Sequence, residues 1–269
     1  MADSFPETRP AEMPSEAGPS RRIRLTLQYD GGAYAGWQEQ PDAVSIQSTL
    51  QGILARMEKR PVALVAAGRT DAGVHALGQV AHFDTATGYP ADTFLRALNA
   101  QLPPDIAVVA ADDVAGDFHA RHSAQGKHYR YRVLNRPAPC PFRRRYAWYV
   151  PRELDVEAMG EGAGRLLGEH DFSSFRASGC GAAHPRRTLT RLDVSRVDDE
   201  VVFDVEGPAF LKQMVRNLVG TLMVVGRGRH SPDWVGNVLA ARDRTVAGET
   251  APAWGLTLVR VFYAQSPVR

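Results

Sequence analysis

The chain has 269 residues, of which 44% are hydrophobic and 23% charged, and its formal net charge is +2. These values are ordinary for a globular protein and allow one large domain or two modest ones. No apolar run approaches the roughly 18 to 20 residues that a membrane-spanning helix needs. The two cysteines, Cys140 and Cys180, argue against a disulfide scaffold or a cysteine zinc site and favour a reducing, cytoplasmic setting.

The N-terminal half begins with a segment of unusual composition. Residues 1–20 hold four prolines, four acids and almost no large apolar side chains, so we expect a disordered tail without an export signal. An α+β domain over residues 21–117 is expected to follow. Apolar periodicity predicts strands over residues 23–29, 62–68, 79–85 and 106–114, a helix over 45–59 with Ser45 as its N-cap, and a helix over 91–105.

The C-terminal half, residues 118–265, repeats this mixture of strands and helices. The same periodicity predicts strands over residues 127–135, 188–197, 201–207 and 256–263, and helices over 155–168, 209–226 and 232–241. Such mixed order in both halves indicates an α+β fold built from two α/β units.

Charge is distributed unevenly along the chain. Residues 118–152 contain no Asp or Glu but nine Arg or Lys residues. This asymmetry suggests a polyanionic partner for one region. A solvated basic face explains the charge equally well.

The segment AAGRTDAGVHALGQV, residues 66–80, places Asp71 in a short loop between glycines. A carboxylate beside the guanidinium of Arg69 is a candidate nucleophile or base. Asp and Gly also form ordinary turns, so both interpretations stay open here. His75 lies four residues later, but Gly73 argues against a helix there and no third ligand is nearby, which favours a packed histidine over a metal ligand.

The segment DFHARHSAQGKHYRYRV, residues 117–133, interleaves basic and aromatic side chains. On an exposed strand, such a pattern suits looped or single-stranded RNA, since cations contact phosphates and aromatic rings stack on bases. The alternative is a sheet edge with its tyrosines in the core and its basic side in water. One of Tyr129 and Tyr131 can be a core residue and the other functional. The candidate phosphate contacts are Arg121, Lys127, Arg130 and Arg132.

The expected helix over residues 209–226 carries Lys212 and Arg216 four residues apart. At this spacing the two side chains share one helix face, while the apolar residues occupy another. The basic face is either ordinary solvated surface or directs a guanidinium toward Asp71. We include Lys212 among the substrate-binding candidates.

The nonapeptide GRTDAGVHA, residues 68–76, closely resembles the signature of the tRNA pseudouridine synthase A family. Motifs of other enzymes, such as a P-loop, a dinucleotide fingerprint or a Gly-x-Ser-x-Gly elbow, are absent. Further segments that resemble the family occur in the expected order between about residues 23 and 263: LQYDGGAYAGWQEQP, GQVAHFDT, FHARHSAQGKHYRYRVLN, LLGEHDFSSFR, AFLKQMVRNLVGTL and APAWGLTLVRVFY.

This resemblance implies an isomerase that converts uridine to pseudouridine at positions 38 to 40 in the anticodon stem and loop of tRNA. It implies no metal and no organic cofactor, and a homodimer in which one tRNA contacts both subunits. The implied fold has two α/β subdomains whose mostly antiparallel sheets join into one extended sheet, with an active-site cleft between them.

The resemblance also implies roles for individual residues. Asp71 matches the catalytic aspartate, Arg69 the arginine that helps to extrude the target nucleotide, Tyr129 the tyrosine beside the uracil, and Arg216 the arginine that pairs with the catalytic carboxylate. The segments that match tRNA-contacting stretches are Phe118, His119, Ala120, Arg121 and His122, and the loop of Gly181, Ala182, Ala183, His184 and Pro185. This loop lacks a basic residue before His184, and Arg186 and Arg187 are candidates to replace it.

The chemistry requires that the N1–C1′ bond breaks, the uracil rotates and a bond to C5 forms. A stacked base cannot rotate, so it must be flipped out of the helix. Asp71 can attack the ribose, deprotonate it or add to the ring, and the sequence does not choose among these. A non-catalytic tRNA-binding or tRNA-folding protein is the alternative, and retention of Asp71 with its partners favours the enzyme. A metal-dependent hydrolase using Asp71 and His75 lacks ligands.

Overall fold

The computed structural model describes residues 20–264, so the tail predicted over residues 1–20 lies almost entirely outside the described residues. The first half contains β1 (Arg21–Tyr29), α1 (Ile46–Glu58), β2 (Val65–Ala66), β3 (His75–Thr85), α2 (Ala91–Asn99) and β4 (Ile106–Val114). The second half contains β5 (Ala124–Leu134), β6 (Trp148–Tyr149), α3 (Val156–Gly164), β7 (Gly168–Asp171), β8 (Arg186–Leu189), β9 (Arg191–Val197), β10 (Glu200–Gly207), α4 (Met214–Gly226), α5 (Asp233–Ala241) and β11 (Leu256–Tyr263).

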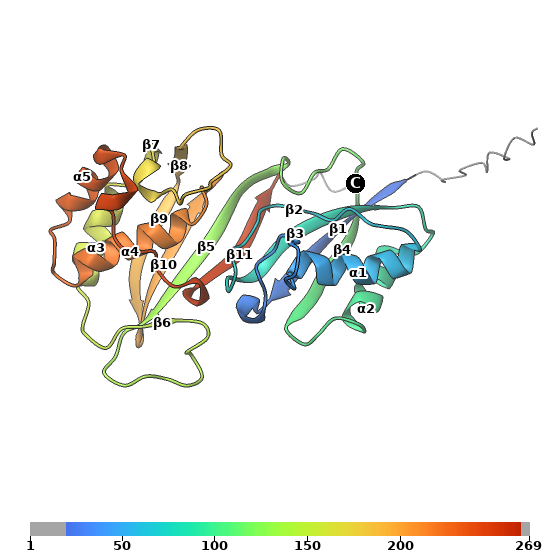
Figure 1. Ribbon diagram of the computed structural model, residues 1–269, viewed down its shortest axis with the longest axis horizontal. Helices are drawn as coiled ribbons and strands as arrows, with labels where there is room; N and C mark the ends of the chain where they lie inside the picture. Colours follow the sequence, from blue (N-terminus) through green and yellow to red (C-terminus); the bar gives the residue numbers. More distant parts are fainter. Residues whose placement is uncertain (1–19, 265–269) are drawn as a thin grey trace, which may run out of the picture.

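One sheet runs through both halves in the order β4–β1–β3–β11–β5–β10–β9, with β2 beside β3 and β6 beside β5 (Figure 1). Most neighbouring strands are antiparallel; β3 with β11 and β5 with β6 are the parallel pairs. This arrangement confirms the predicted α+β fold with an extended, mostly antiparallel sheet.

The last strand joins the two halves. Within β11, Leu258 lies opposite Tyr129 of β5 on one side and Ala76 of β3 on the other. A strand from the end of the chain thus pairs with a strand from each half. We propose residues 117 and 118 as the boundary between the domains, with β11 as the element that they share.

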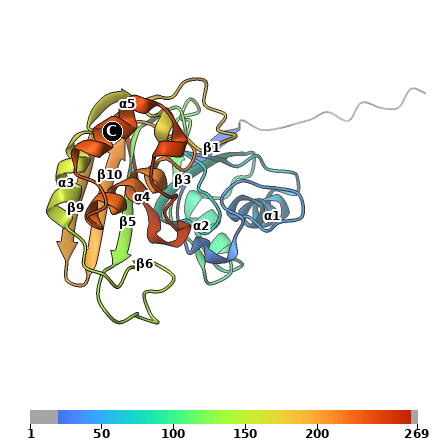
Figure 2. The ribbon, with the colours of Figure 1, turned by 60° about the vertical axis from the view of Figure 1, so that its left-hand side comes forward.

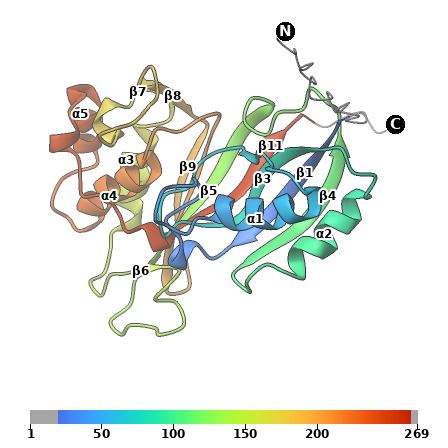
Figure 3. The same cartoon turned by 45° about the vertical axis from the view of Figure 1, so that its right-hand side comes forward.

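Alternating burial explains why the predicted strands form. In β1, Ile23, Leu25 and Leu27 are fully buried, while the residues between them are partly exposed. Helix α1 begins after Ser45, whose hydroxyl accepts a hydrogen bond from Ser48 N, as the N-cap prediction required. Figure 3 shows α1 and α2 in front of the strands of the first half.

Several predicted elements differ from the structure in their bounds. Helices α2 and α3 end at Asn99 and Gly164, before the predicted ends at residues 105 and 168. Strand β3 begins at His75 instead of residue 79, and the strand predicted over residues 188–197 is divided between β8 and β9. The strand predicted over residues 62–68 consists of β2 alone, because side-chain amides of α1 bind the carbonyls that a longer strand would offer to a neighbour. Gln51 donates to Val62 O and Gln47 donates to Leu64 O. Helix α4 begins at Met214 instead of residue 209, because Gln213 has a φ of +59°, outside helical geometry.

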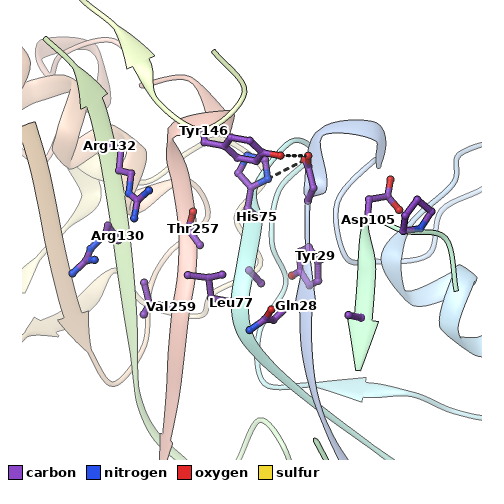
Figure 4. A pocket seen from close by; sticks show the side chains of 14 residues that line it. Gln28, Tyr29, His75, Leu77, Asp105, Arg130, Arg132, Tyr146, Thr257 and Val259 are labelled. Atoms are coloured by element: carbon purple, nitrogen blue, oxygen red, sulfur yellow. Dashed lines mark hydrogen bonds and ion pairs between the residues drawn. The ribbon is translucent and has the colours of Figure 1, made fainter. Parts of the chain in front are cut away.

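No helix covers the far face of the central strands within residues 20–264. Side chains of β1, β3, β5 and β11 on this face line a cavity of about 360 Å³, shown in Figure 4. The connection between β5 and β6 extends beyond the sheet as a long loop (Figure 2), and its Tyr146 lies at the edge of the cavity. We call this surface the uncovered face. No helix of the described residues is long and apolar enough to cross a membrane.

Candidate active site

The loop between β2 and β3 is held on all sides by hydrogen bonds. Trp37 N donates to Thr70 O at 3.0 Å, and the Gln79 side chain donates to Gly68 O at 2.8 Å. The Tyr29 hydroxyl bonds the Thr70 hydroxyl at 2.9 Å. Within the loop, Val74 N donates to Asp71 O at 3.1 Å, which closes a turn. The segment is therefore both a tight turn and a rigid support for an aspartate.

Close backbone contact explains the glycine at position 36. Gly36 has a φ of +93°, and a Cβ added there would lie 2.6 Å from Thr70 O. Only glycine combines this conformation with this approach. The glycine-rich loop after β1 therefore supports the loop that holds Asp71.

Asp71 forms an ion pair with Arg216 from the other half of the molecule. Arg216 Nη1 lies 3.1 Å from Asp71 Oδ2, and Arg216 Nε donates to Ala251 O at 2.7 Å. The Asp71 side chain retains 29% of its exposure and that of Arg216 13%. Arg69 is exposed and forms no ion pair with Asp71. The nearby guanidinium expected from Arg69 is thus supplied by Arg216.

The two tyrosines of β5 have different surroundings. Tyr131 is fully buried and its hydroxyl donates to Pro252 O at 2.8 Å, which makes it a core residue. Tyr129 is 8% exposed and packs edge-on against Phe210. Burial is the largest cause that raises the pKa of Tyr129 above its usual range, and the nearby charge of Asp71 adds to it. Tyr129 is therefore the tyrosine at the site.

The prediction that β5 is an exposed strand or a sheet edge is wrong. Strand β5 lies inside the sheet, with β10 on one side and β11 on the other. Both neighbours come from later parts of the chain, so the local pattern of β5 did not reveal them. Alternate side chains consequently point to opposite faces. Arg130 and Arg132 line the cavity on the uncovered face, where Arg130 pairs with Asp204 and Arg132 with Glu200. These arginines do not join Asp71.

The predicted RNA-contacting segment, residues 118–122, forms a turn between β4 and β5. Arg22 donates to Phe118 O at 2.7 Å, and both backbone polar groups of Ala120 are hydrogen-bonded. Its N–H donates to His82 Nδ1 at 3.1 Å and its O accepts from the Tyr263 hydroxyl at 2.6 Å. The His119 ring packs edge-on against His82 and lies tilted against His122. The turn is anchored from inside, while Arg121 and His122 are exposed.

Lys212 does not share a helix face with Arg216, contrary to the prediction. It precedes α4, is exposed, and donates from Nζ to Ser178 O at 3.3 Å. The left-handed Gln213 turns the chain between Lys212 and the helix, so their side chains diverge. Lys212 thus lies against the loop that follows Phe175.

The other predicted RNA-contacting loop, residues 181–185, follows Ser178, the residue that Lys212 contacts. Arg176 donates to Cys180 O and to Ala182 O, both at 2.7 Å, and Arg187 donates to His184 O at 3.0 Å. A cavity of about 680 Å³ lies beside this loop and the start of α4, and Arg176, Gln213 and Arg244 line it. Gly181, Ala183 and His184 are exposed, while Ala182 and Pro185 are partly buried.

His75 is buried and serves as a structural link. Gly31 N donates to its Nδ1 at 3.1 Å, and its Nε2 lies 2.9 Å from Arg145 O and 3.1 Å from Trp254 O. The same Nδ1 lies 3.1 Å from Asp30 Oδ1. Across residues 20–264, no group of three His, Cys, Asp or Glu side chains has the arrangement of a metal site.

Sequence reasoning missed the residues that support the loop. Tyr29, Gln79 and Trp37 fix it by the hydrogen bonds given above, and Gly36 by close approach. The glycine-rich stretch DGGAYAGW was a signal, since two glycines beside aromatic residues indicate a loop with close backbone contacts. The sequence did not indicate that this stretch contacts the loop that holds Asp71.

The extended sheet, with an aspartate–arginine pair at the junction of its halves, has the architecture of a pseudouridine synthase. The profile of the family described as "tRNA pseudouridine synthase" matches residues 26–123 and 163–264. The tRNA pseudouridine synthase A of Paramagnetospirillum magneticum is 53% identical over 91% of this chain and 96% of its own length. That of Myxococcus xanthus is 52% identical over 91% and 93%. The chain belongs to the tRNA pseudouridine synthase A family and is an isomerase.

Proposed function

We propose that the protein isomerises uridine to pseudouridine at positions 38, 39 and 40 in the anticodon stem and loop of tRNA, with Asp71 as the catalytic carboxylate. The observation that carries the proposal is the Asp71–Arg216 pair, which joins the two halves of the molecule at 3.1 Å. Arg216 engages Oδ2, and within the described residues Asp71 Oδ1 has no hydrogen-bond partner. Oδ1 is therefore free to react with the ribose or the uracil.

Arg216 fixes the orientation of the carboxylate. Its guanidinium donates through Nε to Ala251 O and through Nη1 to Asp71 Oδ2, and these two bonds fix its orientation. A catalytic group that is already oriented avoids the entropic cost of positioning during the reaction. We assign Arg216 this orienting role.

Arg69 and Tyr129 act on the flipped nucleotide in this proposal. Arg69 is exposed two residues before Asp71, where its side chain can fill the gap that the extruded base leaves. The Tyr129 phenol is protonated at neutral pH, and burial raises its pKa further above the ordinary value. Tyr129 therefore offers a stacking face and a hydroxyl that relays the C5 proton. Substrate and product are isomers, so the reaction needs no redox cofactor.

The proposal extends to the partners. We assign tRNA contacts to the turn of residues 118–122, to Lys212 and to residues 181–185. In these segments Arg121, His122, His184 and Lys212 are exposed, whereas Ala120 is buried and anchors its turn. We also propose a homodimer in the cytoplasm. The uncovered face supports the dimer, since it carries exposed apolar side chains such as Leu77, which retains 51% of its exposure.

Release of tritium from tRNA labelled at uracil C5 tests the function, because C5 exchanges its hydrogen for the glycosidic bond. We expect wild type to release tritium in EDTA, and Asp71→Asn to lower the rate by on the order of a thousandfold or more. Asp42→Asn, on an exposed loop residue with a φ of +58° that asparagine tolerates, is the matched control.

Three outcomes would contradict the proposal. A wild-type protein that binds tRNA without tritium release would support the non-catalytic alternative. Equal rates for wild type and Asp71→Asn would remove Asp71 from the mechanism. Loss of activity in EDTA would instead indicate a metal-dependent reaction.

A further inference from the structure

Lys127 extends from β5 toward the loop that holds Asp71. It lies on the same face of β5 as Tyr129 and opposite the face of Arg130, because side chains alternate along a strand. A Cβ added to Gly68 would lie 3.0 Å from Lys127 Cε and 3.9 Å from Nζ. The ammonium group therefore reaches the residue that precedes Arg69.

The Lys127 ammonium has no counter-charge in the free protein. The residue is only 9% exposed, and its side chain forms no ion pair or hydrogen bond with any described residue. The arginines on the opposite face of the same strand are paired with Asp204 and Glu200. Burial lowers the pKa of Lys127, and the like charge of Arg121 lowers it further. A largely buried charge without a partner is unfavourable, so a bound anion would stabilise it.

The neighbouring charges are positive too. Arg69 and Arg121 are exposed and form no ion pair within residues 20–264. The one carboxylate of the loop, Asp71, is already paired with Arg216. Around Gly68 the protein thus presents three cations without an acid to balance them, which is an arrangement that suits an anionic ligand.

A phosphodiester of the substrate is the anion that fits this position. Gly68 and Asp71 are three residues apart, so their Cα atoms are at most about 10 Å apart even in extended chain. This span covers one or two nucleotides of an RNA strand. An anion at Lys127 therefore belongs to the nucleotide bound at Asp71 or to its direct neighbour.

We propose that Lys127 binds a backbone phosphate directly beside the target uridine, and that Arg121 closes the same anion site from the turn of residues 118–122. This inference rests on the proposed function, since it takes RNA as the substrate. Phosphate binding there fixes the backbone on one side of the nucleotide that is extruded. Lys127 is thus a positioning residue for the flipped base.

A cycle of protein and RNA changes tests the contact. The probe is an anticodon stem-loop RNA in which one linkage at a time near the target uridine is replaced by a neutral methylphosphonate. With wild type, we expect one linkage beside the target to lower affinity about tenfold, the loss of one charge-assisted hydrogen bond. With Lys127→Met, the same replacement should cause no further loss.

The salt dependence of binding supplies an independent readout. Lys127→Met should reduce the slope of log affinity against log salt by about one phosphate contact, while Lys127→Arg retains the slope. Lys59→Met is the matched control. Lys59 is an exposed lysine at the end of α1 remote from the catalytic loop, where Glu58 bonds Thr85. Its affinity and slope should equal those of wild type.

The proposal is overturned if no linkage beside the target uridine shows coupling to Lys127, or if Lys127→Met binds RNA with wild-type affinity and slope. The methylphosphonate series on wild type tests the proposal even if Lys127→Met unfolds. If no single replacement near the target uridine lowers the affinity of wild type, no phosphate there is bound by Lys127. Coupling without tritium release by wild type would keep the anion site and overturn only the proposed isomerase. Tritium release without coupling would support the proposed isomerase and overturn the anion site at Lys127.

Discussion

Three buried side chains, none of them at the reacting atoms, decide where Asp71 stands. The Gln79 amide donates to both Gly68 O and the Tyr29 hydroxyl, and Tyr29 bonds Thr70. Burial raises the pKa of Tyr29 to about 12, so its hydroxyl remains a donor at any physiological pH. Hydrogen bonds in a dry interior are expensive to leave unmade, which makes the loop rigid.

Another buried residue, His82, makes the free energy of unfolding depend on pH. Its Nδ1 accepts from Ala120 N, and burial, the largest cause, lowers its pKa to about 4. In the unfolded chain the pKa returns to about 6.5, so between these values the unfolded state binds the proton and the folded state does not. The free energy of unfolding should therefore fall by about 2–3 kcal/mol as pH drops from 6.5 to 4.

Denaturant unfolding at pH 7.5 and 4.5, for wild type and His82→Gln, measures this contribution. Other groups titrate in the same window, so the difference between the two proteins isolates His82. Glutamine keeps an acceptor for Ala120 N without a titrating ring. An identical pH dependence in both proteins would show that His82 does not carry the effect.

At the scale of elements, the connection from β1 to α1 locks two segments at once. Gly36 O accepts from Ile46 N and Trp37 O from Gln47 N, which ties the connection to the first turn of α1. The same connection contacts the loop that holds Asp71, since Trp37 N donates to Thr70 O. Hydrogen bonds therefore link the helix, the connection and the loop to one another.

Gly36→Ala tests this lock. The new Cβ would lie 2.6 Å from Thr70 O at a φ of +93°, so the loop must shift. We expect a loss of about 1–3 kcal/mol in the free energy of unfolding and a lower rate of tritium release. Gly88→Ala is the control, because a Cβ there meets nothing within 4 Å. Equal activity of both variants would show that the catalytic loop does not depend on Gly36.

At the scale of the whole molecule, the segment before β11 connects both halves of the site. Ala251 O accepts from Arg216, Pro252 O accepts from Tyr131, and Trp254 O lies 3.1 Å from His75 Nε2. One short segment thus fixes an arginine of α4 and the start of β3. The geometry of the Asp71–Arg216 pair follows from the folding of the whole chain.

The proposed dimer gives a prediction at this scale. Leu77 lies on the uncovered face, and a twofold interface repeats each substitution in both subunits. We expect light scattering to give a dimer mass for wild type and a monomer mass for Leu77→Asp. Val246→Asp, at a similarly exposed apolar residue outside this face, should stay dimeric. A monomeric wild type would contradict the homodimer, and a dimeric Leu77→Asp would place the interface elsewhere.

Local pattern predicted the elements because burial alternates with the same period as the sequence. The strands around Ile23 and Tyr131 and the N-cap at Ser45 followed from side-chain spacing and capping chemistry alone. The errors arose where tertiary contacts compete with local preference. The Gln51 side chain binds the Val62 carbonyl, so the predicted strand does not extend ahead of β2. The left-handed conformation of Gln213 ends the helical geometry between Lys212 and α4.

The sequence by itself determined the class of fold and the family, and it singled out Asp71 as the candidate catalytic residue, because periodicity and an uninterrupted motif are local properties of the chain. Only the tertiary structure decided the geometry of the pair that the family resemblance implied: Arg216 Nη1 lies 3.1 Å from Asp71 Oδ2, whereas Arg69 is exposed and forms no ion pair with Asp71. It also placed Lys127 beside the loop that holds Asp71 and the next arginines of the same strand on the opposite face. These relations depend on strands and loops that are distant in sequence, and β11 brings them together only when the chain is complete.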